Sequence, residues 1–198
     1  MLKYTSILKS RSYLYLELKK AAQLTNQGLP IGDIKHKSLE ENIFLVNTDS
    51  RKREIASTII NRLKVLDDYL INEIANGNLQ SSKQLALYSI MKTDRLFFEF
   101  MTEVYKEKVF LNDLIITDKD FNVFFRGKSE QSKKIAGWKD YTIYKLKQVY
   151  KRILSEAGFI TKKGDRLEIL PQIMEPSLMD HLKRIGDLSY IGAMLGEV

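Results

Sequence analysis

Three observations predict an all-α protein, a compact helical protein with helix-turn-helix elements and one small β-hairpin wing near the C-terminus. Apolar residues recur at the spacing of amphipathic helices along most of the 198 residues. Only three prolines and ten glycines interrupt the chain, while Leu, Lys, Ile and Glu are plentiful. A hydrophobic fraction of 44% with 10% aromatic residues is enough to build a core and excludes a disordered chain.

The composition also excludes several classes of protein. Cysteine is absent, which excludes disulfide frameworks, thiolate zinc sites and cysteine nucleophiles. No apolar run approaches the roughly 20 residues that span a bilayer. The N-terminal stretch lacks the apolar segment of a signal peptide. We therefore expect a cytoplasmic protein without a membrane partner.

The first half of the chain is expected to contain four helices. Gly28 and Pro30 act as stop signals after the first of them. The polar stretch Asn47–Ser50 supplies N-cap residues for a long third helix, and Ser81 or Ser82 is expected to cap the fourth. The four segments are Tyr4–Gln27, Ile31–Glu41, Ser50–Ala75 and Lys83–Met91.

The second half begins with a helix that is apolar on most sides and that Asp94 is expected to cap. Asp118 is expected to cap the next helix, and Gly127 to end it. The connection between these two helices predicts a boundary between an N-terminal helical subdomain, 1–112, and a C-terminal one, 113–198. The expected helices outside the central basic segment are Arg95–Phe110, Lys119–Arg126, Ser177–Ile185 and Leu188–Leu195.

The segment Ser132–Leu170 has the order of a winged helix-turn-helix: short helix, tight turn, long basic helix and hairpin. The long helix carries one apolar stripe, and Gly158 ends it at a position that favours positive φ. The hairpin turn, Lys162–Arg166, contains three basic side chains. Such a unit places a helix in the DNA major groove and its wing on the backbone. The apolar stripe of the long helix consists of Ile143, Leu146, Tyr150, Ile153 and Ala157. The two strands of the hairpin are Phe159–Thr161 and Leu167–Ile169.

The positive charge of the chain is concentrated in the same region. The formal net charge is +7, and residues 119–166 contain thirteen Lys or Arg but only five Asp or Glu. The other 150 residues therefore carry a net charge of −1. A basic surface on a nearly neutral body indicates a polyanionic partner. A solvated basic face without a partner remains the alternative, because excess charge also increases solubility.

The long helix supplies the candidate contacts to nucleic acid. Lys145, Gln148 and Arg152 lie on one outward face and are expected to reach base edges. Six other basic residues are expected to lie towards phosphates: Lys128, Lys133, Lys134, Lys162, Lys163 and Arg166. Lys139, Lys147 and Lys151 complete the predicted nucleic-acid-binding residues of this segment.

A second basic helix-turn-helix candidate lies near the N-terminus. Lys35, His36 and Lys37 point outward from the second expected helix, although the pattern alone favours an ordinary corner of two helices. Arg51, Lys52 and Arg53 follow at the start of the third helix, where basic residues oppose the helix dipole. A bound phosphate would favour them there. Alternatively, three exposed cations cost only a few tenths of a kcal/mol each and need no ligand.

Aromatic residues interleave with the basic residues of the long helix. Trp138, Tyr141, Tyr144 and Tyr150 could stack on exposed bases, which would favour single strands or RNA. However, Tyr150 lies on the apolar stripe and Trp138 at the turn, so both are assigned to the core. Duplex DNA then fits the segment better than single strands.

Catalytic and cofactor motifs were sought and not found. The two histidines, His36 and His181, are far apart in the sequence, which argues against zinc. Asp113, Asp118 and Asp120 are the densest carboxylates, but capping explains Asp118 better than Mg²⁺ does. No phosphate-binding glycine loop or serine nucleophile motif occurs. We therefore expect a binding protein without catalytic residues or cofactors.

Several stretches together resemble the BrxA family of BREX bacteriophage-exclusion systems. The resemblance covers nearly the whole chain and depends on the order and spacing of many short matches. They are Glu40–Phe44, Arg62 with Leu63, Lys83–Leu85, Asp94–Leu96 with Phe98 and Phe100, Trp138 with Thr142, Lys145 and Leu146, and Ile153 with Leu154 before Ala157–Ile160.

This resemblance implies a helical fold with helix-turn-helix elements that binds double-stranded DNA, and it supplies no catalytic residues. It also implies an operon that encodes a DNA methyltransferase, a phosphatase-like protein and ATPases, any of which is a candidate partner. It strengthens the N-terminal helix-turn-helix candidate. We expect a monomer. An assembly adaptor that docks other BREX components and a structured-RNA binder remain the alternatives.

Overall fold

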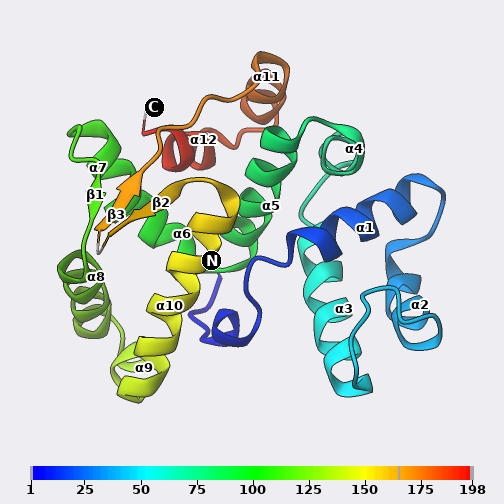
Figure 1. The fold of residues 1–198 in the computed structure, drawn as a ribbon, viewed down its shortest axis with the longest axis horizontal. Coiled ribbons are helices and arrows are strands. Elements are labelled where there is room, and N and C mark those ends of the chain that lie inside the picture. Colours follow the sequence, from blue (N-terminus) through cyan, green and yellow to red (C-terminus); the bar gives the residue numbers. More distant parts are fainter. Residues whose placement is uncertain (1, 165, 197–198) are drawn as a thin grey trace. The chain divides into compact units, whose positions relative to one another are not determined.

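The computed structural model describes residues 2–164 and 166–196, and these are mainly helical with one small antiparallel sheet (Figure 1). The predicted fold class is confirmed. Within the described ranges, no helix combines the length and the apolar character that crossing a bilayer requires.

The chain forms two compact units. The first unit is Tyr13–Thr93, and the second contains the described residues of 1–12 and 94–198. The sequence-based boundary between residues 112 and 113 falls within the second unit. The assignment of functional domains on either side of it stays a prediction.

The first unit consists of five α-helices and a short 3₁₀ turn among the described residues. One helix was expected over residues 50–75, but the chain forms two, because the Asp67 side chain accepts a hydrogen bond from the Leu70 N–H (2.9 Å) and starts a new helix. The elements are α1 (Tyr15–Asn26), η2 (Ile31–Asp33), α2 (Ile34–Glu40), α3 (Asp49–Leu63), α4 (Asp68–Asn76) and α5 (Leu79–Thr93).

Two other expectations for this unit were wrong at the helix ends. The first helix starts at Tyr15 and not near Tyr4, because Leu14 has a left-handed backbone with φ of 51°. Asn78 caps α5 in place of Ser81 or Ser82, since its side chain accepts from the Ser81 N–H. The Ser82 hydroxyl is buried and donates instead to the Ile74 carbonyl.

The second unit contains the remaining elements. One helix was expected over residues 95–110, and this segment is helical throughout with a π-helical middle. The Asp94 side chain caps it by accepting a hydrogen bond from the Phe97 N–H (2.9 Å). The elements are η1 (Ile7–Ser10), α6 (Arg95–Phe100), η3 (Met101–Lys106), α7 (Glu107–Phe110), β1 (Ile115–Ile116), α8 (Asp118–Gln131), α9 (Lys133–Ala136), α10 (Asp140–Ala157), β2 (Ile160–Lys163), β3 (Arg166–Ile169), α11 (Pro176–Arg184) and α12 (Leu188–Leu195).

The cap of α8 differs from the expectation. Thr117 is its N-cap, and the Asp120 carboxylate accepts hydrogen bonds from the Thr117 backbone N–H (2.6 Å) and hydroxyl (2.7 Å). Asp118 therefore does not cap α8, contrary to the expectation. Gly127 lies inside the helix, which continues to Gln131.

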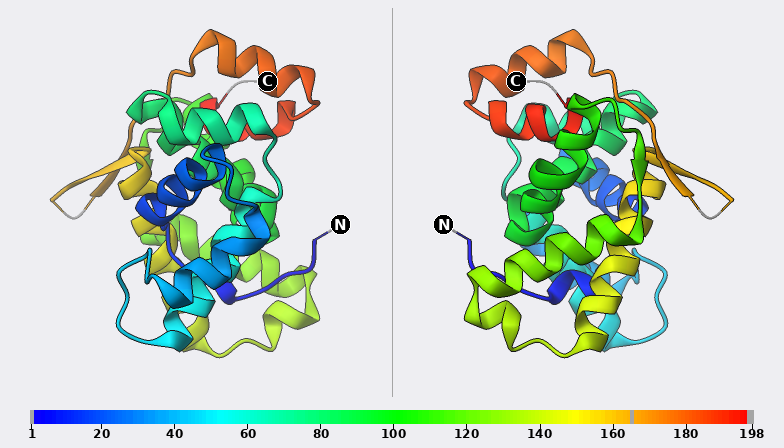
Figure 2. Two further views of the ribbon diagram at one scale, coloured as in Figure 1. Left: turned by 90° about the vertical axis from the view of Figure 1, so that its right-hand side faces the viewer. Right: turned by 90° about the vertical axis from the view of Figure 1, so that its left-hand side faces the viewer.

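The hairpin near the C-terminus is confirmed, and it belongs to a slightly larger sheet. The strand order is β1-β3-β2, with Ile115 opposite Glu168 and Ile160 opposite Ile169, all antiparallel. The sequence analysis treated β1 as a connection because it is only two residues long. The hairpin projects beyond the helices of its own unit (Figure 2). Asp165, part of the expected turn, lies outside the described residues.

An aromatic cluster forms the core of the second unit. The Tyr150 ring of α10 is fully buried and contacts Phe97 and Phe100 of α6 and Phe125 of α8, with ring centroids 5.0, 5.3 and 5.8 Å away. Phe100 also stacks on Phe121 at 4.9 Å. These contacts hold α10 against both α6 and α8.

The Tyr150 hydroxyl is buried without a hydrogen-bond partner among the described residues. Burial, with the charges of Asp94 and Glu99, raises its pKa well above the ordinary value. We expect Tyr150→Phe to leave the free energy of unfolding unchanged or to raise it by up to ~1 kcal/mol, because it removes an unsatisfied polar group. Tyr150→Ala should lower it by about 3–5 kcal/mol, because it opens a cavity.

Urea titration followed by circular dichroism measures both variants. A Tyr150→Phe variant that loses more than ~1 kcal/mol would show that the hydroxyl has a partner in solution.

Candidate nucleic-acid interface

The packing of α10 decides which of its side chains reach solvent. Leu146, Tyr150, Ile153 and Ala157 of the predicted stripe are buried, and Ile143 is half-buried. Gly158 ends the helix with φ of 83°, as its position predicted. The opposite face of α10 is therefore exposed.

Gln148 and Arg152 lie on this exposed face, as predicted. Tyr141 and Tyr144 share it and are 66% and 54% exposed. These two tyrosines were considered for stacking on exposed bases, and their spacing to Gln148 and Arg152 follows the helical period. The Lys145 ammonium lies over the Tyr141 ring, 5.3 Å from its centroid.

A groove of about 540 Å³ lies between α10, the hairpin and the start of α8. It brings together five predicted contact residues that the sequence separates by up to 18 positions, from Gln148 to Arg166. The lining residues are Ile116, Thr117, Asp118, Gln148, Lys151, Arg152, Ser155, Lys162, Arg166 and Leu167. We call it the basic groove.

The basic groove has a positive charge. Among the described residues, its lining contains the cations Lys151, Arg152, Lys162 and Arg166 and one acid, Asp118. The Lys151 ammonium contacts the Asp118 carboxylate at 2.5 Å, whereas no ion pair with the described residues joins the other three cations. Several uncompensated cations around one concave surface attract anions and suit the oxygens of phosphate groups.

The other predicted residues of this segment lie outside the groove lining. Lys133, Lys134 and Lys139 are exposed at α9 and before the start of α10. Lys163 is exposed on the hairpin, 3.7 Å from Glu168. Lys147 donates to the Asn122 side chain at 2.5 Å. The last two are placed near the groove but are engaged within the protein.

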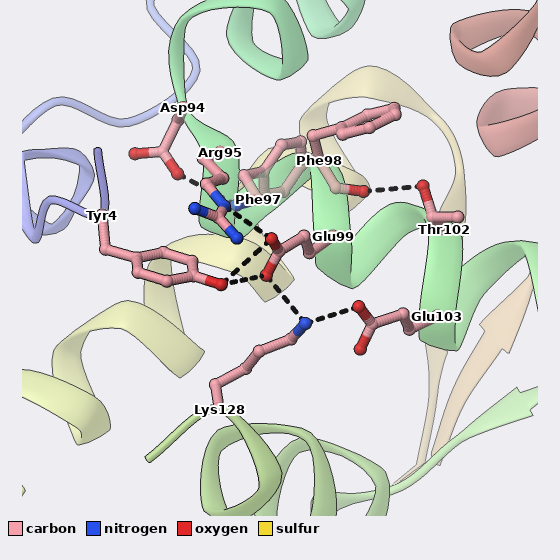
Figure 3. Close-up of polar contacts among 9 residues, drawn as sticks. All are labelled: Tyr4, Asp94, Arg95, Phe97, Phe98, Glu99, Thr102, Glu103 and Lys128. Atoms are coloured by element: carbon pink, nitrogen blue, oxygen red, sulfur yellow. Dashed lines mark hydrogen bonds and ion pairs between the residues drawn. The ribbon is translucent and has the colours of Figure 1, made fainter. Parts of the chain in front are cut away.

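Lys128 is not on the surface, and its predicted exposure was wrong. Its side chain is only 5% exposed, and its ammonium contacts the Glu99 and Glu103 carboxylates at 2.7 and 2.5 Å (Figure 3). Burial alone would lower the pKa of Lys128, but its bonds to these two carboxylates raise it above the ordinary value. Lys128 therefore links α8 to the helix that begins at α6.

Glu99 is the centre of this polar network. It also accepts hydrogen bonds from the Tyr4 hydroxyl (2.9 Å) and from Arg95 (2.7 Å), which ties the N-terminal segment to α6 (Figure 3). Burial alone would raise the pKa of Glu99, but the bonds from Lys128, Arg95 and Tyr4 hold it below the ordinary value. Stability from Glu99 is thus present above about pH 4 and is lost as the pH falls through its lowered pKa.

We expect Lys128→Met to lower the free energy of unfolding by about 3 kcal/mol, because it leaves buried carboxylates without their main cation. Lys133→Met, at an exposed site, should change it by less than about 0.5 kcal/mol. Thermal and urea unfolding at pH 7 measure both variants. Equal stability of the two would contradict a structural role for Lys128.

The basic residues of the first unit are mostly paired on their own helices. Lys37 contacts Glu41 at 2.6 Å, Arg51 contacts Glu54 at 2.8 Å, and Lys52 contacts Asp49 at 3.1 Å. Lys35 and Arg53 are exposed. Helix α2 packs against α3, so all five predicted cations belong to one pair of helices, Lys35 and Lys37 on α2 and Arg51, Lys52 and Arg53 on α3.

The carboxylates once considered for Mg²⁺ have other partners. Asp120 caps α8, Asp113 contacts Lys108 at 2.7 Å, and Asp118 contacts Lys151. Among residues 2–164 and 166–196, no three His, Asp or Glu side chains gather as a metal site would require. Each of these three carboxylates therefore has a partner within the protein.

Comparison with known proteins identifies the family of this chain. The family model described as BrxA matches residues 2–186. The chain belongs to the BrxA family. A relative from Bacillus cereus (strain H3081.97), described as BREX protein BrxA, is 52% identical over 194 residues, which cover 98% of this chain and 97% of the relative. The family resemblance seen in the sequence is confirmed.

A solved structure shares the fold of this BrxA-family chain. It is a crystal structure of an uncharacterized protein from Magnetospirillum magneticum, with a TM-score of 0.82 and 19% sequence identity. The match covers 99% of this chain and 100% of that protein. At this identity the likeness concerns the fold alone.

Proposed function

We propose that this chain binds double-stranded DNA through the exposed face of α10 and the basic groove, as a non-enzymatic component of a BREX phage-defence system. The observation that carries the DNA-binding part is the convergence of Lys151, Arg152, Lys162 and Arg166 on one groove beside an exposed helix face. The BREX part is supported by the description of the Bacillus cereus relative.

The order of elements in the second unit supports a winged helix-turn-helix. A helical run (α6 to α7), strand β1, helix α8, helix α10 and the β2–β3 hairpin follow one another, with the strands in the order β1-β3-β2. In such a unit α10 is the recognition helix and the hairpin is the wing. An 18-residue helix is about 27 Å long, and the major groove is about 12 Å wide, which admits a helix.

The residues then divide into base and phosphate contacts. Gln148 and Arg152 face outward and have the hydrogen-bonding groups that read adenine and guanine edges. Lys151, Lys162 and Arg166 contact phosphates beside them, and Lys133, Lys134 and Lys139 extend the positive surface. Lysine outnumbers arginine among these residues, so affinity is mainly electrostatic and sequence selectivity is weak.

Other parts of the proposal concern the setting of the protein. The exposed cations of the first unit, Lys35 and Arg53, add a second, weaker contact to DNA. Candidate protein partners are the methyltransferase, phosphatase-like protein and ATPases that the family resemblance implies. The chain acts in the cytoplasm as a monomer, and it contributes binding and no catalytic residue.

Affinity for duplex DNA should fall steeply with salt, because each neutralised phosphate releases a counterion. We expect the slope of log K against log salt to lose about 0.9 for each phosphate contact removed. The triple variant Arg152→Ala, Lys162→Ala, Arg166→Ala should therefore lose about 2 in slope, because it removes the phosphate contacts of Lys162 and Arg166 together with the base contact of Arg152. Fluorescence anisotropy with a labelled 20-base-pair duplex between about 50 and 200 mM salt measures this.

Lys183→Ala serves as the matched control. Lys183 is exposed on α11 and does not line the basic groove, so this variant should keep the parent's slope. An affinity that does not change with salt, or a triple variant with the parent's slope, would contradict DNA binding at this groove. Stronger competition by structured RNA than by duplex DNA would favour the RNA alternative. Nuclease-resistant co-purification with other BREX proteins, without a duplex shift, would favour the adaptor.

A further inference from the structure

The single acid of the basic groove has an unusual position. Asp118 lies in the first turn of α8 and contacts Lys151, 33 residues away on α10. Its side chain is 81% exposed, whereas that of Lys151 is 26% exposed. The negative charge of Asp118 therefore lies on one of the four cations that line the basic groove.

This ion pair is not needed to hold the two helices together. Helices α8 and α10 are joined by the buried contact of Phe125 with Tyr150, which removes large apolar surfaces from water. An ion pair with one highly exposed partner adds little to stability, because water screens it and two side chains must be ordered. Asp118 is also released from capping α8, which Thr117 and Asp120 accomplish.

The Lys151 side chain stays aimed at the groove for a second reason. Its ammonium lies over the Phe121 ring, 5.2 Å from the centroid. This contact is attractive and does not involve Asp118. Lys151 is therefore held at the groove even when the carboxylate moves away, and its charge is then available to another anion.

We propose that the basic groove is a phosphate-binding site, and that the Asp118 carboxylate occupies the place of a phosphate oxygen on Lys151 until a phosphate displaces it. The source of that phosphate, the backbone of duplex DNA, rests on the proposed function. Asp118 thus competes with the ligand for Lys151 and sets how tightly an anion must bind the groove in order to displace it.

This arrangement has a consequence for selectivity. An anion that contacts only Lys151 replaces one anion–lysine contact with another and is repelled by the nearby Asp118 carboxylate. Such an anion therefore gains little binding free energy. A DNA strand that also contacts Arg152, Lys162 and Arg166 gains enough to displace it. Unfavourable charge of this kind rejects weak partners at some cost in affinity for the correct one.

The test compares single-charge variants of the full chain. Asp118→Asn should lower the Kd for a 20-base-pair duplex by about three- to tenfold and should steepen the salt slope by about one. Asp180→Asn is the matched control, because Asp180 is an exposed acid on α11 that does not line the groove. It should change the Kd by less than about twofold.

A double variant separates competition on Lys151 from a general charge effect. Lys151→Met should weaken duplex binding, and Asp118→Asn should then add little or nothing in the Lys151→Met background. Inorganic tripolyphosphate, measured by titration calorimetry, is the second probe. Its binding should tighten in Asp118→Asn and be lost in Lys151→Met. Circular dichroism and thermal unfolding establish that every variant is folded.

Several outcomes would overturn the inference. Equal gains from Asp118→Asn and Asp180→Asn would show a general charge effect. A full gain from Asp118→Asn without Lys151 would show that the pair is irrelevant. Duplex binding that Asp118→Asn leaves unchanged would overturn the inference while the proposed function stands.

Tripolyphosphate binding with the expected variant pattern but no duplex binding would support the phosphate site and contradict the proposed function. Binding of neither probe would contradict both.

Discussion

The burial of Tyr150 among Phe97, Phe100 and Phe125 is the constraint on which the second unit depends. It removes the only large aromatic ring of the inner face of α10 from water and joins that helix to α6 and α8. Once this face is buried, helical geometry requires that the residues half a turn away are exposed. The outward direction of Gln148 and Arg152 therefore follows from apolar packing and not from any property of the polar residues themselves.

Lysine has two different roles in this unit, and burial separates them. Lys128 lies inside the protein, where Glu99 and Glu103 compensate its charge and where it helps to connect α8 with the helix that follows Asp94. Lys151 lies at the groove, where one exposed carboxylate compensates it incompletely. The two carboxylates raise the pKa of the buried Lys128, and moving Lys128 away from them would leave their charges uncompensated. Lys128 therefore has a structural role. An exposed pair can be exchanged for a ligand at small cost.

The groove combines binding surface from elements that are separate in the sequence. Helix α10 supplies two of its cations, the hairpin supplies two, and α8 supplies the opposing acid. The short strand β1 matters for this arrangement because it pairs with β3 and attaches the hairpin to the start of α8. The affinity for a polyanion and the restraint by Asp118 that we propose thus both depend on the β1–β3 pairing.

The sequence by itself determined the helical class, the end of α10 at Gly158, the hairpin after it, the concentration of positive charge and the family. These features depend on neighbours in the chain: periodicity of apolar residues, a glycine at a position of positive φ, and local composition. Even so, the break before Asp68 was missed, because the apolar period continues across it and only the Asp67 cap reveals the new helix. The tertiary structure alone decided which cations are free. Lys128 meets Glu103 25 residues away and Lys151 meets Asp118 33 residues away, and contacts at such separations are set by how the helices pack, which no local pattern records.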